Sequence, residues 1–229
     1  MTLLLAMLTT MTAWADVTIS STAEWETFAN AVSKGTTYSG QIVTLTNDIT
    51  VTTMAGSSQT NSFQGFFYGG GYTLTFNATT TAENCAPFAY INGATFSCLK
   101  VAGTISTSKK YAAGIAAHSY GTCTIQNCQS SITVNSTISG DGTHAGFVAV
   151  EESGCTLTIN NCLFDGSISG STTTNCGGFV GWRNSTLTFN NCLQNGTLSI
   201  KEESGSATYN RNGSSTLNNC YYKTAYGDV

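Results

Sequence analysis

A short string that ends in Asn-Cys recurs along the second half of the chain and limits what such a chain can fold into. Its copies occupy residues 122–128, 156–162, 186–192 and 216–220. They end at Cys128, Cys162, Cys192 and Cys220. These cysteines are 34, 30 and 28 residues apart. A period of about thirty residues is typical of proteins in which each copy forms one supersecondary unit. The spacing therefore predicts a solenoid.

Apolar and polar residues alternate within each copy with the period of a β-strand. In the second copy this period sends Leu157 and Ile159 to one face of the strand and Thr156 and Thr158 to the other. We expect the apolar face to line the core. In stacked copies the outward threonines then form two columns of hydroxyl groups on one flat face. These are Thr122, Thr124, Thr156, Thr158, Thr186 and Thr188.

An asparagine directly precedes the cysteine in each copy and predicts a bend of the chain. Asparagine tolerates a left-handed backbone conformation, and its side-chain amide can bond the equivalent residue in the next copy. We therefore expect a ladder of stacked asparagines along one corner of the solenoid. Its members are Asn127, Asn161, Asn191 and Asn219.

Five of the nine cysteines are assigned to equivalent places in successive copies. They are Cys98, Cys128, Cys162, Cys192 and Cys220. Equivalent residues of adjacent coils lie about 4.8 Å apart, so a buried column of thiols fits this geometry. A disulfide between neighbouring coils is the competing interpretation, because that spacing lies within the Cα separation that a disulfide tolerates.

The first forty residues differ from the repeats. Residues 1–15 are largely apolar and end in Ala-Trp-Ala, the small-x-small pattern of a cleaved secretory signal peptide. Residues 16–40 are expected to be a capping segment, because apolar residues recur with helical spacing within residues 21–35. The apolar face of this helix would cover the open end of the stacked strands.

Residues 41–229 are predicted to form a right-handed parallel β-helix of about six coils. Asp165-Gly166 and Asn195-Gly196 mark a second corner of the coil, but such dipeptides are also strong hairpin signals. An antiparallel meander is therefore the alternative topology. It is disfavoured, because antiparallel partners would not need Asn and Cys at fixed points of every repeat. The expected fold class is all-β, a solenoid with a short N-terminal capping helix.

Two further motifs carry resemblances to secreted proteins. Residues 63–74 resemble a Phe-x-Gly-x-Phe-Asp-Gly-Asn-Gly-His-Thr-Ile turn of parallel β-helix proteins, with Tyr68 in place of Asp and Gly70 in place of Asn. Small-residue openings recur at residues 87–89, 114–117, 146–149 and 178–181. These openings look like the GLUG repeat of secreted bacterial surface proteins and haemagglutinin-type adhesins. The resemblance covers residues 86–229 and implies an adhesin-type parallel β-helix.

The charged residues give little support for an enzyme. They make up only 9% of the chain, against about a quarter of a typical domain. A lyase or glycosidase on this fold would need paired carboxylates or an acidic calcium site. The aspartates of the mature chain are scattered over starts, corners and ends: Asp16, Asp48, Asp141, Asp165 and Asp228. Glu151-Glu152 and Glu202-Glu203 are expected in solvated linkers, and His118 and His144 as ordinary exposed or turn residues. No catalytic residue, metal site or cofactor is predicted.

Ligand binding is expected on the outward strand face and in turns. The candidate residues are the six outward threonines and Trp182. Other aromatic residues near turns could also stack on sugars: Tyr120, Tyr209, Tyr221 and Tyr222. Flat threonine arrays resemble ice-binding solenoids as well, which gives a minor alternative.

The predicted function is a non-enzymatic, adhesin-like or structural repeat module with a glycan-binding alternative, exported to the extracellular space or the outer surface of a bacterium. A polysaccharide lyase or glycosidase is the alternative class. Expected partners are surface glycans, host or neighbouring-cell proteins, and other copies joined through an uncapped C-terminal coil. Nucleic acid is not an expected partner, because the net charge is −4 and no basic run is present. A transmembrane chain is not expected, because no later stretch approaches ~20 apolar residues.

Overall fold

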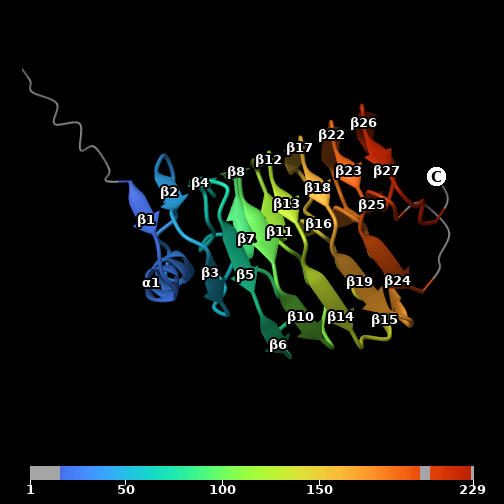
Figure 1. Ribbon diagram of the computed structural model, residues 1–229, viewed down its shortest axis with the longest axis horizontal. Helices are drawn as coiled ribbons and strands as arrows, with labels where there is room; N and C mark the ends of the chain where they lie inside the picture. The colour runs from blue at the N-terminus through green and yellow to red at the C-terminus, as the bar shows by residue number, and fades with distance from the viewer. Residues whose placement is uncertain (1–15, 202–206, 228–229) are drawn as a thin grey trace, which may run out of the picture.

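The computed structural model describes residues 16–201 and 207–227 and shows a parallel β-helix. About seven turns of chain stack along one axis (Figure 1), and the strands of each sheet pair in parallel with those of the next turn. The parallel pairing confirms the predicted all-β solenoid and excludes the antiparallel meander. It follows from the repeat, because each copy returns to the same side of the molecule one turn later.

Each complete turn contributes strands to four sheets. The eight-stranded sheet contains β1 (Val17–Ile19), β2 (Ile42–Leu45), β4 (Phe66–Tyr68), β8 (Thr95–Ser97), β12 (Thr122–Gln126), β17 (Thr156–Asn160), β22 (Thr186–Asn190) and β26 (Thr216–Asn218). The seven-stranded sheet contains β3 (Ile49–Val51), β5 (Thr73–Phe76), β9 (Lys100–Ala102), β13 (Gln129–Ser130), β18 (Leu163–Phe164), β23 (Leu193–Gln194) and β27 (Tyr221–Tyr222).

The remaining strands complete the turn. One five-stranded sheet contains β6 (Ala78–Thr80), β10 (Thr104–Thr107), β14 (Thr133–Ser136), β19 (Ser167–Gly170) and β24 (Thr197–Ile200). The other contains β7 (Phe88–Asn92), β11 (Ala116–Tyr120), β16 (Val148–Glu151), β21 (Val180–Arg183) and β25 (Asn210–Arg211). A two-stranded ribbon is formed by β15 (Gly140–Asp141) and β20 (Thr173–Thr174).

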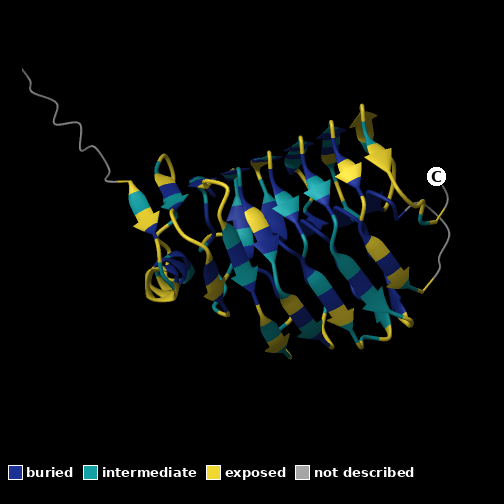
Figure 2. Ribbon diagram, viewed as in Figure 1, coloured by how far each residue is buried: buried dark blue, intermediate teal, exposed yellow. Residues whose placement is uncertain are grey.

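The core is a stack of inward side chains enclosed by these sheets. Strand periodicity buries one apolar column of the eight-stranded sheet in register. Its buried members are Val43, Phe67, Phe96, Ile125, Ile159 and Phe189. Figure 2 shows buried and more exposed positions alternating along these strands. The predicted separation of Leu157 and Ile159 from Thr156 and Thr158 is therefore confirmed.

The eight-stranded sheet begins earlier than residue 41, where the sequence places the start of the β-helix. Strand β1 lies before the helix and pairs with β2 from Val17↔Val43 to Ile19↔Leu45. A three-residue strand in an otherwise polar stretch gives little periodic signal, and its pairing with a strand beyond the helix is not local. The sequence predicts about six coils, whereas the structure has about seven turns. Strand β1 lies before the predicted start of the β-helix and was not counted in the prediction.

Helix α1 (Thr22–Ser33) covers the N-terminal end of the stack (Figure 1). Ser21 caps it, since its side chain accepts from the Glu24 N–H at 3.3 Å. The Glu24 carboxylate accepts from the backbone N–H of Ser20 at 2.7 Å, one residue earlier than a reciprocal capping box requires. Gly35, with φ of 104°, follows the last turn.

The buried face of α1 closes the core with aromatic rings. Trp25 and Phe28 lie 5.4 and 6.1 Å from Phe88 between ring centroids, and Phe63 lies 5.6 Å from Phe28. The Trp25 indole also donates to the Thr53 carbonyl at 2.8 Å. The Thr53 carbonyl therefore satisfies the indole N–H, while the helix seals the apolar interior from water.

The asparagine corner forms as predicted. Asn127, Asn161, Asn191 and Asn219 have φ between 52° and 54°. Their side chains bond turn to turn at 3.1, 3.0 and 2.8 Å. The left-handed conformation turns the chain, and the amides satisfy one another along the corner.

Cys98 does not belong to the cysteine column in which the sequence places it. The pairing Ser97↔Gln126 aligns Cys98 with Asn127, and Cys98 has the corner conformation with φ of 54°. Leu99 takes the inward place next to it and is fully buried. The turn that contains Cys98 lacks the Asn-Cys pair. Aligning its cysteine with the later cysteines therefore shifts the register by one residue.

The other four cysteines of the column are stacked as free thiols. Cys128, Cys162 and Cys192 are buried, and Cys220 is partly exposed. Each thiol donates to the carbonyl two residues earlier, at 3.1 to 3.4 Å. The Cys128 N–H also donates to the Cys162 sulfur at 3.4 Å. The column therefore packs against the backbone of the corner.

The small-residue openings are required by contact between turns. A Cβ on Gly146 would lie 2.4 Å from the Gly178 carbonyl oxygen, and a Cβ on Gly178 would lie 2.3 Å from that of Thr208. Adjacent turns approach so closely here that a side chain would force them apart.

Candidate functional site

The outer face of the eight-stranded sheet presents columns of hydroxyl groups. Thr122, Thr156 and Thr186 form one column in register. The second column is longer than the sequence predicted, and its members are Thr95, Thr124, Thr158, Thr188 and Thr216. All these side chains are exposed or half-buried. Thr95 and Thr216 were missed, although they stand at the same strand position in shorter copies.

Amides extend this surface toward the corner. Gln126, Asn160, Asn190 and Asn218 form a third outward column. Asn190 donates to Asn160 at 2.7 Å and Asn218 donates to Asn190 at 2.8 Å. This second ladder runs beside the predicted one. We call the three outward columns the threonine–asparagine face.

A cluster of titratable and aromatic side chains lies on β11 and its neighbours, just before the chain enters β12. The tyrosine–histidine cluster consists of Asn84, Tyr90, Tyr111, His118, Tyr120 and Glu152. His118 Nδ1 lies 2.8 Å from Glu152 Oε1, and Nε2 lies 2.8 Å from Asn84 Oδ1. The Asn84 amide donates to the Tyr90 hydroxyl at 2.8 Å. Both ring nitrogens are therefore engaged.

Three tyrosine rings surround the imidazole. Tyr90 stacks on His118 with 4.8 Å between centroids, Tyr111 lies 4.6 Å away, and Tyr120 lies 6.4 Å away and nearly parallel. The Tyr120 hydroxyl donates to Glu152 at 3.5 Å. Burial and the nearby Glu152 charge raise the pKa of Tyr120 to about 12, so the phenol keeps its proton. Each tyrosine is half-buried and exposes part of its ring.

This arrangement corrects two expectations. His118 is 8% exposed and hydrogen-bonded, so it is not an ordinary exposed residue. Glu152 is half-buried and bonded to His118, so it is not a freely solvated linker residue. His118 and Glu152 meet across 34 residues of sequence. Only alignment of β7 and β11 turn by turn, which pairs Tyr90 with His118, could have revealed the cluster.

Trp182 stands in the same outward column as Tyr90 and His118, two turns after His118. It is half-buried, and its indole donates to Asn184 at 3.1 Å. Val150 separates it from His118 in the column. The structure thus places Trp182 on the same sheet as the cluster and apart from the threonine columns.

Glu151 is also not a solvated linker residue, because it is fully buried. Its Oε2 accepts from the backbone N–H groups of Asn184 and Ser185 at 2.8 and 2.6 Å. Burial raises the pKa of Glu151 despite these bonds. Glu151 therefore anchors the loop after β21, which contains Asn184 and Ser185. Glu202 and Glu203 lie outside the described residues.

His144 is buried rather than exposed. Nδ1 accepts from the Ala112 N–H at 3.3 Å, and Nε2 lies 2.9 Å from Ser136 Oγ. Burial lowers the pKa of His144 to about 4. The ring is therefore neutral with its proton on Nε2, and it donates to Ser136. It cannot act as the base that activates this serine.

The carboxylates of the corners lie in separate local networks. Asp141 accepts from Lys110 at 2.5 Å and from Thr143 at 2.6 Å. Asp165 accepts from Gln129 at 2.8 Å and from Ser131 at 2.6 Å. Within the described residues, no group of three or more His, Cys, Asp and Glu side chains is placed to hold a metal ion.

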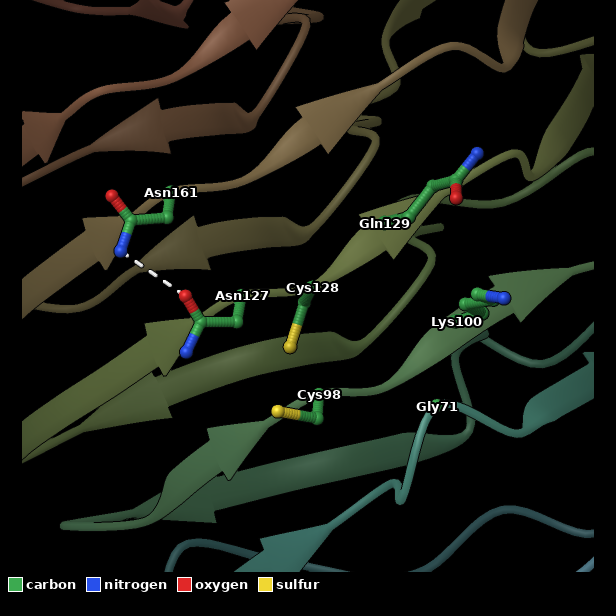
Figure 3. Close-up of a pocket in the computed structure, with 7 residues that line it drawn as sticks. All are labelled: Gly71, Cys98, Lys100, Asn127, Cys128, Gln129 and Asn161. Carbon is green, nitrogen blue, oxygen red and sulfur yellow. Dashed lines mark hydrogen bonds between the residues drawn. The ribbon is translucent and has the colours of Figure 1, made fainter.

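An open pocket of about 330 Å³ lies at the corner between the eight-stranded and seven-stranded sheets (Figure 3). It is lined by Gly71, Cys98, Lys100, Asn127, Cys128, Gln129 and Asn161. Asn127 and Asn161 belong to the asparagine ladder, and the pocket therefore adjoins the threonine–asparagine face. Sequence reasoning missed it, because it depends on the corner that Cys98 occupies.

Comparison with known proteins supports the fold. No family model and no curated relative matches the chain. A crystal structure from Bacteroides ovatus, described as a "putative immunoglobulin A1 protease", is similar with a TM-score of 0.51 and 15% identity. The match covers 91% of this chain and 75% of that chain. At this identity the likeness shows a shared β-helix fold alone. Within the described residues, no helix is long and apolar enough to cross a membrane.

Proposed function

We propose that this chain is a non-enzymatic glycan-binding module of the adhesin type. The observation that carries the proposal is the tyrosine–histidine cluster beside the threonine–asparagine face. Half-buried aromatic rings offer apolar surfaces to the C–H faces of sugars, while the hydroxyl and amide columns offer donors and acceptors to sugar hydroxyl groups. Tyr90, Tyr120 and the amide column are held by hydrogen bonds before any ligand arrives, which lowers the entropic cost of binding.

The same contacts favour binding over catalysis. A general base needs a nitrogen or oxygen free to reach a substrate proton. In His118 both ring nitrogens already have partners, and the corner carboxylates Asp141 and Asp165 are each bonded by neighbours. The description of the B. ovatus protein as a protease suggests a peptidase alternative. The Ser136–His144 contact does not support it, because the proton on Nε2 points toward the serine.

A glycan array combined with a reducing-sugar assay on the same purified protein tests this proposal. Retention of a glycan without release of reducing ends is the expected result. Tyr120→Ala should lower the affinity about tenfold, because a stacked ring is lost. Leu193→Ala, which removes an exposed apolar side chain outside the cluster, is the control and should bind as the parent does. Turnover of a bound glycan would replace the proposal with the lyase or glycosidase alternative.

The threonine columns favour a second candidate, binding of ordered water or ice. They stand in register over up to five turns, at the regular spacing of parallel strands, ~4.8 Å. Thermal hysteresis that disappears in Thr158→Val would support this function. A freezing point unchanged by the parent protein would leave glycan binding as the sole proposal.

We also propose export and surface display. Residues 1–15 carry the signal-peptide pattern, and the GLUG-like openings resemble secreted surface proteins. N-terminal sequencing of the protein recovered outside the cell should begin at Asp16. Association of copies through the last described turn, where Leu217 is 49% and Tyr221 is 63% exposed, is a further proposal. Sedimentation of the parent and of Leu217→Glu would test it.

A further inference from the structure

His118 faces an oxygen atom at each of its two ring nitrogens. Nδ1 lies 2.8 Å from a carboxylate oxygen of Glu152, and Nε2 lies 2.8 Å from the side-chain oxygen of Asn84. The amide nitrogen of Asn84 is turned the other way and donates to the Tyr90 hydroxyl at 2.8 Å. A neutral imidazole carries one N–H, whereas an imidazolium carries two. Both contacts are therefore hydrogen bonds only when the ring is positively charged.

The nearest groups favour this charge. Glu152 supplies a negative charge at Nδ1 from the residue that follows β16. Tyr90, on β7, stacks on the ring with 4.8 Å between centroids and nearly parallel planes, and Tyr111 lies 4.6 Å away. The faces of aromatic rings attract a cation that lies within about 6 Å of the centroid. A charged imidazole is thus paired and covered, although it is largely withdrawn from water.

The other titratable groups around the ring do not oppose the charge. Tyr120, at the end of β11, keeps its proton, because burial and the Glu152 charge raise its pKa to about 12. Lys110 lies beyond Tyr111, with its Nζ 4.9 Å from the centroid of that ring. Asp141 forms an ion pair with Lys110 and so balances this second cation.

Loss of one proton reverses the hydrogen bonds on one side of the ring. The Nδ1–H remains, because it donates to a carboxylate and that bond is charge-assisted. The proton on Nε2 passes to the solvent, and Nε2 becomes an acceptor. The Asn84 amide then turns over, so that its N–H donates to Nε2 and its oxygen accepts the proton of the Tyr90 hydroxyl. Without this turn, the Asn84 oxygen would face a lone pair.

The relay from His118 through Asn84 sets the direction of the Tyr90 hydroxyl. With the ring charged, the Tyr90 oxygen accepts from Asn84, so its own proton is free to donate to a ligand. With the ring neutral, Asn84 accepts that proton. We infer that His118 makes Tyr90 a hydrogen-bond donor to a glycan oxygen in mildly acidic solution and withdraws this donor at higher pH. His118 is thus a positioning residue, and the inference rests on the proposed glycan binding.

The glycan array tests this inference when it is run with the full chain at about pH 5.5 and about pH 8.5, on either side of the ordinary histidine range. Neutral glycans are compared, because their own charge does not change with pH. Retention should be about fivefold to tenfold tighter at the lower pH, which is the size of one hydrogen bond. Equal retention of every bound glycan at the two pH values would overturn the inference.

Tyr90→Phe is the sharpest variant. It keeps the stacked ring and removes only the hydroxyl, so it should bind at both pH values as the parent does at the higher one. His118→Gln, which cannot become charged, should also lose the pH dependence. His144→Gln is the matched control and should keep the parent's ratio, since burial already lowers the pKa of His144 to about 4. A Tyr90→Phe protein that still binds more tightly at the lower pH would contradict the assignment.

Nitrogen NMR of the His118 ring reads its charge without any glycan. Both ring nitrogens should carry protons at about pH 5.5, and Nδ1 alone should carry one at about pH 8.5. Because linkage is reciprocal, a bound neutral glycan should increase the fraction of charged ring at an intermediate pH. A proton on Nδ1 alone at both pH values would overturn the inference.

The results separate this inference from the proposed function. Glycan retention that depends on Tyr120 but is the same at both pH values would overturn the inference and leave the proposed function standing. An array that is blank at both pH values would overturn both, even where the ring nitrogens change their protons as expected.

Discussion

Single residues at the corner decide both the turn and the pocket. Asparagine is suited there because its amide offers a donor and an acceptor while its backbone tolerates positive φ. Cys98 has the same conformation, with φ of 54°, but offers neither function well. One residue therefore interrupts a ladder that continues through every later copy.

Cys98→Asn should stabilise the protein by about 1 kcal/mol. Asparagine is better tolerated at positive φ, and its Oδ1 would accept from the unused Asn127 amide. Urea unfolding followed by circular dichroism measures the change. Cys98→Ser is the matched control, since serine removes the thiol without extending the ladder. A Cys98→Asn protein no more stable than Cys98→Ser would count against this account.

His144 should make stability depend on pH. Burial lowers its pKa to about 4 in the folded chain, against about 6.5 in the unfolded chain. The unfolded chain therefore binds this proton first as the pH falls. The stability contributed by the neutral buried ring is complete above pH ~6.5 and is lost progressively toward pH 4, by about 3 kcal/mol.

Unfolding free energies of the parent and of His144→Gln, measured between pH 7 and pH 4, test this dependence. The variant should be less stable at pH 7, because two buried contacts change, but its curve should be flatter. Parallel curves for the two proteins would show that His144 is not the titrating group.

At the scale of elements, the asparagine ladder joins successive turns along one corner. Its contribution can be separated into a hydrogen-bond term and a backbone term at Asn161, which donates to Asn127 and accepts from Asn191. Asn161→Gly keeps the left-handed conformation and should cost about 1 kcal/mol. Asn161→Ala loses that tolerance too and should cost about 1–2 kcal/mol more. Thermal unfolding of both variants gives the two terms, and equal stabilities would show that backbone strain is negligible here.

Element register also explains which site predictions succeeded. The outward threonines could be predicted because a strand's two faces follow from its own sequence. The tyrosine–histidine cluster could not, because Tyr90, His118 and Glu152 belong to three successive turns separated by linkers of unequal length. Likewise, Glu151 and Glu152 are adjacent in sequence, yet one is buried under a loop and the other bonds His118.

For the whole molecule, the N-terminal helix determines how the open end of the solenoid is closed. Trp25 is fully buried and contacts Phe67 and Phe88 of two different turns. Trp25→Ala should therefore lower the free energy of unfolding by about 3–5 kcal/mol and increase binding of an apolar dye. Glu26→Ala, on the exposed side of the same helix, should change stability by less than about 0.5 kcal/mol. A mild effect of Trp25→Ala would mean that the strands alone close this end.

The sequence by itself determined the solenoid, the inward and outward faces of its strands, the asparagine corner and the helix, because each depends on a short period or on a local backbone preference. Only the tertiary structure decided that Cys98 takes a corner position, that β1 joins a sheet beyond the helix, and that three tyrosines surround His118. These features depend on the register between turns. Linkers of unequal length set that register, and no periodic pattern within one copy encodes it.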